Sequence, residues 1–314
     1  MIASPRTGRQ HAMAVLQGLF VTFLWSTSWV LVKIGLDELD LQPLSFAGLR
    51  YALAALILLP FGVRAMRAAH SAAPLSGRLL GRVAIYGLLF VAVAQGAQFV
   101  ALGLLPATAV NLVLSSIPAI VALLALSTMA ERPSAGQAAG IGLLIAGAVL
   151  YFGPFELTPE APLGIMAAAV CALAAAVSSH VGRGLARDAI ARLGGPIGLT
   201  ASSMAIGAAL LLGTGLMVEG IPALDPAGWL IVAWLAVVNT AFAFTLWNHT
   251  LRTLTAVESS VVNNTMTIQI AVLAIVFLGE RLGPLQLAGL FLAAAGALVV
   301  QLAPRLRRPA PTSI

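Results

Sequence analysis

The sequence predicts an all-α integral membrane protein in which ten transmembrane helices form two inverted-topology five-helix repeats around a central cavity. The first observation is composition: 60% of the 314 residues are apolar and only 9% are charged, whereas soluble domains carry about 25% charged residues. The second is a series of ten apolar runs, each near the ~20 residues needed to cross a hydrocarbon core. The third is an internal duplication.

The duplication joins the two halves of the chain at a constant spacing of 149 residues. One half carries a pattern that recurs in the other, with Glu131-Arg132, Gln137, Gly140 and Gly147 repeated as Glu280-Arg281, Gln286, Gly289 and Gly296. Each unit holds five apolar runs, an odd number, so tandem copies must cross the bilayer in opposite senses. Secondary transporters use this inverted-repeat construction.

The first apolar run, 12–33, follows Arg6 and Arg9 and therefore resembles a signal peptide. It is longer than a typical signal-peptide core and no Ala-x-Ala cleavage site follows it, so we assign it as the first span. We expect all ten runs to be helices, because lipid leaves backbone groups without other partners. The remaining nine are 44–63, 83–103, 106–129, 137–154, 163–182, 196–218, 227–249, 256–278 and 284–303.

The duplication and the connections between runs predict one membrane domain in two related halves. Its expected parts are an N-terminal segment (1–11), a first repeat (12–154), a linker (155–162), a second repeat (163–303) and a tail (304–314). Glycines spaced seven residues apart close each repeat, which is typical of close helix packing. We favour packing within the chain over a dimer interface, and the sequence leaves the oligomeric state open.

The net charge is +6, and the distribution of the basic residues along the chain indicates how the protein is oriented in the membrane. Fourteen arginines fall on one side of the predicted spans, and the loops of the other side hold only Lys33 and Arg281. By the positive-inside rule both termini are cytoplasmic. The basic residues are scattered and form no stripe, so nucleic acid is not an expected partner; the lipid bilayer and a small-molecule substrate are.

The candidate substrate-binding residues are polar or amphipathic side chains deep within apolar runs, where they are costly unless they face a partner or a watery cavity. They are Trp25, Gln95, Gln98, Ser115, Asn239, Asn264 and Thr267. The alternative for each is a hydrogen bond between helices, which averages about 0.6 kcal/mol in membranes. Trp29 and Trp247 lie nearer the span ends, which is typical of interfacial belt residues.

Arg50 is the one charge well inside an apolar run and has two interpretations. It snorkels to the outer surface or holds a structural partner, or its guanidinium binds a substrate carboxylate within the cavity. Lys33 is similarly an interfacial anchor or a carboxylate-attracting gate. Pro118 interrupts the fourth run and predicts a hinge there.

Several functions lack their sequence signature. The phosphate-binding motif of nucleotide-driven pumps is missing, since Lys33, the single lysine, follows Val32. The four histidines and the lone Cys171 form no catalytic or metal-binding pattern. We therefore expect no enzyme, no cofactor and no metal. No carboxylate lies at mid-span, which leaves Glu258 and His180 as weak candidates for a proton relay.

Motifs along residues 12 to 303 resemble those of a known family. They are Trp25-Ser26, Lys33-Ile34-Gly35-Leu36, Pro43, Leu49-Arg50-Tyr51, Ala54-Ala55-Leu56 and the two Ala/Gly-Glu-Arg copies. This combination resembles EamA-type members of the drug/metabolite transporter superfamily, and within them the bacterial exporters of aromatic and other neutral amino acids. The resemblance implies two inverted five-helix repeats, a central cavity, export of small metabolites and a bacterial inner-membrane location. The helix-one glutamate of the small multidrug relatives has no equivalent here.

The sequence thus favours a secondary transporter that exports a small metabolite, most simply a neutral or aromatic amino acid, by alternating access. One alternative is a broad-specificity exporter of drugs or other hydrophobic compounds. Another, from a different class, is a membrane scaffold that transports nothing. The preferred substrate and coupling to protons stay open at this level.

Overall fold

The structure, a computed structural model, describes residues 8–69, 76–128, 131–132, 134–153, 159–183, 185, 187–303 and 306–307. Within these ranges, ten helical spans are long and apolar enough to cross a membrane. The predicted ten-helix fold is therefore confirmed. Of the predicted segments, residues 1–7, 155–158, 304–305 and 308–314 lie outside the described residues.

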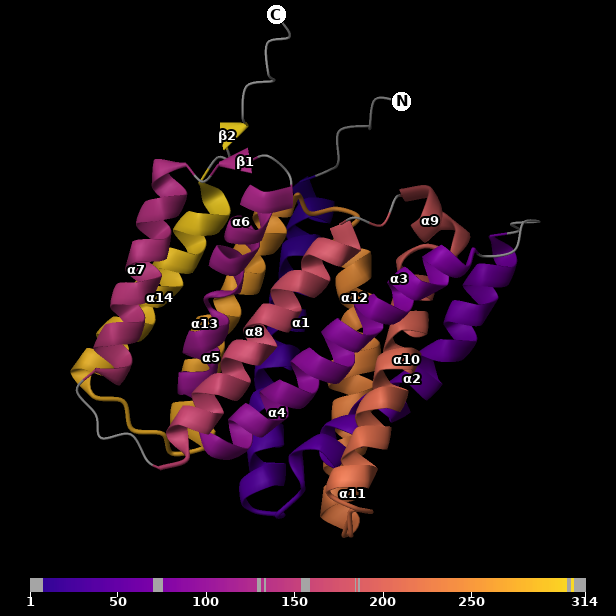
Figure 1. Cartoon of the computed structure of the whole chain (residues 1–314), viewed down its shortest axis with the longest axis horizontal. Coiled ribbons are helices and arrows are strands. Elements are labelled where there is room, and N and C mark those ends of the chain that lie inside the picture. Colours follow the sequence, from indigo (N-terminus) through magenta and orange to yellow (C-terminus); the bar gives the residue numbers. More distant parts are fainter. Residues whose placement is uncertain are drawn as a thin grey trace, which may run out of the picture.

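The first repeat contains eight helical segments and a two-residue strand (Figure 1). They are α1 (Gly8–Asp37), α2 (Pro43–Ala68), α3 (Gly77–Gly87), η1 (Leu88–Val93), α4 (Ala94–Leu104), α5 (Ala107–Leu114), α6 (Ile117–Thr128), β1 (Glu131–Arg132) and α7 (Ala135–Phe152). The second repeat contains α8 (Ala161–Arg183), α9 (Arg187–Arg192), α10 (Pro196–Val218), α11 (Pro226–Ala236), η2 (Val237–Phe242), α12 (Ala243–Thr250), α13 (Ala256–Phe277), α14 (Pro284–Leu302) and β2 (Leu306–Arg307).

The closing helices of the two repeats, α7 and α14, lie side by side at one edge of the bundle (Figure 1). A Cβ added at Gly140 would lie 2.8 Å from the Gly296 oxygen, and one at Gly147 would lie 2.6 Å from the Gly289 oxygen. Higher numbers on α7 thus face lower numbers on α14, so these equivalent helices run antiparallel. The glycine stripes serve packing within the chain.

The same relation holds at the opposite edge, where α2 packs against α10 (Figure 1). A Cβ on Gly48 would meet the Cα of Leu212 at 2.5 Å, and one on Gly215 would meet the amide nitrogen of Ser45 at 2.6 Å. Equivalent helices that pair antiparallel at both edges are what a two-fold axis across the bundle produces. The packing therefore agrees with the inverted topology predicted from the duplication.

Three spans are interrupted, which the apolar runs did not predict. The third and eighth spans each contain a six-residue π-helix, η1 and η2, whose first residues Leu88 and Val237 are 149 residues apart. The fourth span breaks at Ser115–Ser116 between α5 and α6. Pro118 lies in the first turn of α6, where its missing N–H costs least.

The even number of spans places the start of α1 and the end of α14 at the same end of the bundle, which we call the proximal end. The opposite, distal end carries the connections α1–α2, α4–α5, α10–α11 and α13–α14 (Figure 1). At the proximal end, β1 pairs antiparallel with β2, with Glu131 opposite Arg307. This short pair links the first repeat to the segment after α14.

Candidate functional site

The π-helix η2 is the meeting point of the two repeats. Asn239, on η2, is fully buried, and its Nδ2 donates to the carbonyl of Leu24 and, at 3.1 Å, to Thr27 Oγ1 on α1. Its Oδ1 has no hydrogen-bond partner in the described chain. The wider turn of a π-helix, which is frequent at functional sites, thus presents a half-satisfied amide to the interior.

The next residue of η2, Thr240, is the hydrogen-bond partner of Arg50. The Nε of Arg50 donates to Thr240 Oγ1 at 3.1 Å, and the Thr240 hydroxyl donates in turn to the Leu235 carbonyl. Arg50 is 5% exposed, so it does not snorkel to the outer surface, while its hydrogen bond to Thr240 agrees with the structural-partner alternative. No described carboxylate lies within ion-pair distance of it, and its guanidinium instead lies 5.1 Å from the Tyr51 ring centre and 5.8 Å from that of Phe99.

A row of aromatic rings crosses from one repeat to the other beside η2. Trp25 on α1 lies 5.3 Å, between ring centres, from both Phe244 and Trp247 on α12. Phe244 continues to Phe90 on η1 at 6.2 Å, and Phe90 to Tyr86 on α3 at 5.5 Å. The Trp25 Nε1 is buried without a partner among the described residues. Of these rings, sequence analysis had proposed only Trp25 as a lining residue.

Gln95 and Gln98 lie on α4, just past η1. The Gln95 Oε1 accepts a 2.6 Å hydrogen bond from the Tyr51 hydroxyl, which places it beside Arg50. At the 149-residue spacing these glutamines correspond to Phe244 and Trp247. The repeats therefore place amides in one half and aromatic rings in the other at equivalent positions.

A second polar contact joins α5 and α13. The Asn111 Nδ2 donates to the Thr267 carbonyl at 3.0 Å, and the Ser115 hydroxyl donates to the Asn111 carbonyl at 3.0 Å. The Asn264 Nδ2 is directed at the Ala294 carbonyl of α14, at 3.4 Å. Ser115, Thr267 and Asn264 thus have contacts separate from the cluster around η2.

Sequence analysis missed a polar strip between α1 and α13. Ser26 Oγ donates to Gln269 Oε1 at 3.0 Å, while Gln269 Nε2 donates to Thr22 at 3.3 Å and to Thr265 at 3.2 Å. The available signal was a spacing of four within each pair, Thr22 with Ser26 and Thr265 with Gln269, which puts each pair on one helix face.

The belt assignment of two tryptophans also changes. Trp29 is only 6% exposed and belongs to the core, so its assignment as a belt residue is wrong. Trp247 is partly buried and packs on Trp25. Position along a span did not reveal on which side of the helix these rings lie.

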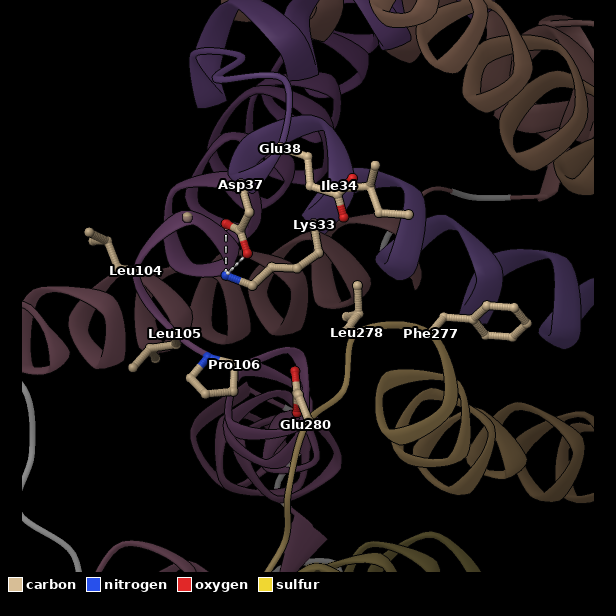
Figure 2. A pocket seen from close by; sticks show the side chains of 11 residues that line it. Lys33, Ile34, Asp37, Glu38, Leu104, Leu105, Pro106, Phe277, Leu278 and Glu280 are labelled. Carbon is tan, nitrogen blue, oxygen red and sulfur yellow. Dashed lines mark hydrogen bonds and ion pairs between the residues drawn. The ribbon is translucent and has the colours of Figure 1, made fainter.

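A pocket of about 340 Å³ opens at the distal end (Figure 2). Its lining comes from the end of α1, the α4–α5 connection and the α13–α14 connection: Lys33, Ile34, Asp37, Glu38, Gly103, Leu104, Leu105, Pro106, Phe277, Leu278 and Glu280. The Lys33 Nζ lies 3.0 Å from Asp37 and donates to the Leu102 carbonyl at 2.8 Å. Lys33 therefore ties down the ends of α1 and α4, as an anchor would.

Chemically, the cluster around η2 combines one buried cation, amides and aromatic faces, a set suited to binding an organic molecule. Among the side chains that the structure describes, no group of three or more His, Cys, Asp or Glu residues is placed to hold a metal ion. The fold and this cluster define a membrane protein of the inverted-repeat transporter class.

Comparisons with known proteins give the family. The sequence model of the EamA-like transporter family matches residues 12–153 and again residues 162–302. The chain therefore belongs to the EamA-like transporter family, within the drug/metabolite transporter superfamily. A search of curated proteins found no match.

Among solved structures, 15 chains match. One, titled only "Crystal structure of protein", superposes with a TM-score of 0.62 over 92% of this chain and 98% of its own, at 22% sequence identity. At that identity the likeness supports the fold alone.

Proposed function

We propose that the protein exports a small zwitterionic metabolite, a neutral amino acid with an aromatic or large apolar side chain, by alternating access between its two repeats. The observation that carries the proposal is Arg50, a buried cation without a described carboxylate, held at the junction of the repeats. An unpaired buried charge is costly and marks function when it lies at membrane depth. A substrate carboxylate would complete it with forked hydrogen bonds.

The aromatic row supports the proposal that the substrate carries an aromatic or large apolar side chain. Trp25, Phe244 and Trp247 offer ring faces from both repeats, and aromatic pairs gain about 0.5–1.5 kcal/mol beyond the area that they bury. The free Trp25 Nε1 and Asn239 Oδ1 supply one donor and one acceptor. Gln95 and Gln98 complete the polar side, with Ser115, Thr267 and Asn264 proposed as lining residues after them.

We infer the direction of transport from the distribution of charged residues between the two ends of the bundle. Most described arginines at span ends, among them Arg64, Arg82 and Arg252, lie toward the proximal end, whereas Arg281 lies at the distal end together with Glu219 and Glu280. The positive-inside rule then makes the proximal end cytoplasmic. We place the protein in a bacterial cytoplasmic membrane as a carrier without catalytic role or cofactor.

Counterflow of labelled phenylalanine in proteoliposomes tests the proposal. Phenethylamine, which lacks the carboxylate, should compete about 10- to 100-fold less well than phenylalanine, since a charged hydrogen bond is worth about 1.5–3 kcal/mol. Arg50→Gln should abolish counterflow. Arg64→Gln is the matched control, because Arg64 is an exposed arginine of the same helix.

The outcomes separate the alternatives. Absence of counterflow for every amino acid, with folded protein in the vesicles, would remove amino-acid export. If no solute of any kind moves, the result would favour the alternative that the protein is a membrane scaffold that transports nothing. Normal phenylalanine counterflow by Arg50→Gln would remove the role assigned to this guanidinium.

A broad exporter of hydrophobic compounds is the second candidate, and the five-ring aromatic row favours it. In that case contacts with the aromatic rings would contribute more to substrate binding than the contact between Arg50 and a substrate carboxylate. Phenethylamine and other amines would then compete as well as phenylalanine, while Trp25→Ala would impair transport more than Arg50→Gln.

A further inference from the structure

Glu280, on the α13–α14 connection of the second repeat, holds the N-terminus of α5 in the first. Its Oε1 accepts from the Ala107 amide at 2.6 Å, and its Oε2 accepts from the Thr108 amide at 3.3 Å and the Thr108 hydroxyl at 2.6 Å. Tyr151 supports the hydroxyl from α7, with 2.7 Å between the two oxygens. A carboxylate also suits the positive end of a helix dipole.

The N-terminus of α5 depends on this contact because it has no cap of its own. Its N-cap residue, Pro106, provides no side-chain hydrogen bond. The equivalent helix of the second repeat, α13, is capped from within, since Thr255 and Glu258 form a reciprocal capping box. The two repeats therefore share this helix but not the way its N-terminus is capped. Of the two copies, only α5 takes its cap from the other repeat.

The segment that Glu280 holds is a short helix that ends at a break in its span. The eight-residue α5 ends at the break between Ser115 and Ser116, where the helical hydrogen-bond ladder is interrupted. Its other polar contact with the second repeat is the Asn111 amide on the Thr267 carbonyl. The distal pocket lies directly beside the contact, with Pro106 and Glu280 in its wall (Figure 2).

We propose that Glu280 is a latch that keeps the distal end of the transport path closed, and that the pocket beside it is the closed mouth of that path. Release of the carboxylate would free the α5 N-terminus, let α5 pivot at Ser115–Ser116 and connect the pocket to the space between the repeats. The inference rests on the proposed alternating access. It makes the distal-closed state the resting state, which suits a carrier that loads from the proximal side.

Accessibility of a buried reporter tests the latch. Ala271 is 6% exposed and lies four residues distal to Thr267, hence on the same face of α13. In a Cys171→Ala background, Ala271→Cys would be labelled with a membrane-impermeant thiol reagent in right-side-out and in inside-out vesicles. Adding Glu280→Gln should speed labelling at least tenfold from one face only, that of the distal end. An unchanged rate, or acceleration from both faces, would overturn the proposal.

Two matched variants separate the latch from general effects. Glu38→Gln removes a carboxylate from the same pocket and should leave the labelling rate unchanged. Glu219→Gln removes a similar cap, since Glu219 accepts from the Leu44 and Ser45 amides at 2.9 and 2.7 Å. That cap joins α2 and α10, which also pack backbone to backbone at Gly48 and Gly215, so labelling should again stay slow. Acceleration by either variant equal to that of Glu280→Gln would overturn the proposal.

A cross-link that replaces the carboxylate contact by a covalent one also tests the latch. The double variant Thr108→Cys/Glu280→Cys, closed by a short bifunctional thiol reagent with a reducible disulfide, should stop counterflow, and reductant should restore it. Full transport by the fully cross-linked protein would overturn the latch. Since the labelling assay uses no substrate, its failure alongside intact phenylalanine counterflow would leave the proposed function standing, and the reverse pattern would leave the latch standing.

Discussion

At the scale of single residues, the informative side chains are those whose hydrogen bonds cross from one repeat to the other. Arg50 reaches Thr240, Asn239 reaches α1, and Gln269 reaches Ser26 and Thr22. Sequence alone identified Arg50 and Asn239, because a charge or amide in an apolar run is conspicuous. It passed over the threonines, since hydroxyls are common in membrane helices and Thr22 and Thr265, whose hydroxyls meet, lie 243 residues apart in the chain. It also passed over Gln269, although this amide stands in an apolar run as Asn239 does.

Gln269→Leu should destabilise the protein by about 1–2 kcal/mol, because it removes three hydrogen bonds that average about 0.6 kcal/mol each in membranes. Gln301→Leu is the control, since the buried Gln301 Oε1 has no partner within the described residues, and it should be neutral or stabilising. Thermal unfolding in detergent micelles measures both. If Gln269→Leu lost no more stability than Gln301→Leu, the α1–α13 strip would contribute nothing to the stability of the protein.

At the scale of elements, glycine contacts and interrupted helices set the geometry. The seven-residue glycine spacing predicted close packing, and the structure shows that the partner of each stripe is the equivalent stripe of the other repeat. The π-helices were not predictable from periodicity. A single extra residue per turn leaves an apolar run apolar, yet it turns the following residues by about 100° and so decides which way Gln95 and Phe244 face.

Gly147→Ala should destabilise the protein by about 1–3 kcal/mol, since its Cβ would lie 2.6 Å from the Gly289 oxygen. Gly142→Ala, on the same helix, has open space around its Cβ. That substitution should be neutral or gain up to about 1 kcal/mol of helix propensity. The comparison is made by thermal unfolding in detergent, and a Gly147→Ala protein as stable as Gly142→Ala would contradict the packing described for α7 and α14.

At the scale of the whole molecule, two antiparallel helix pairs lie at opposite edges of the bundle, with other helices packed between them (Figure 1). The pairs α2–α10 and α7–α14 approach backbone to backbone, whereas the polar contacts among α1, α5 and α13 are made by side chains. Under the proposed alternating access, we expect the two edge pairs to stay together while the inner helices change their contacts.

The orientation of the molecule can be measured with single cysteines. Ile221→Cys, at a distal position that is 90% exposed, should react with an impermeant maleimide on intact cells. Leu251→Cys, in the proximal α12–α13 connection, should react only after the cells are permeabilised. The native Cys171 is 2% exposed and gives little background. The opposite labelling pattern would reverse the orientation inferred from the arginines.

The sequence by itself determined the class, the ten spans, the two related halves and their opposed topology. Each of these follows from composition, from the length of apolar runs, or from the parity of a duplicated unit, which are properties of the chain taken in order. Only the tertiary structure decided which polar residues meet. Helix rotation set by η1 and η2, and the capping of α5 by Glu280 from the other repeat, depend on contacts between residues far apart in the chain, about which local pattern carries no information.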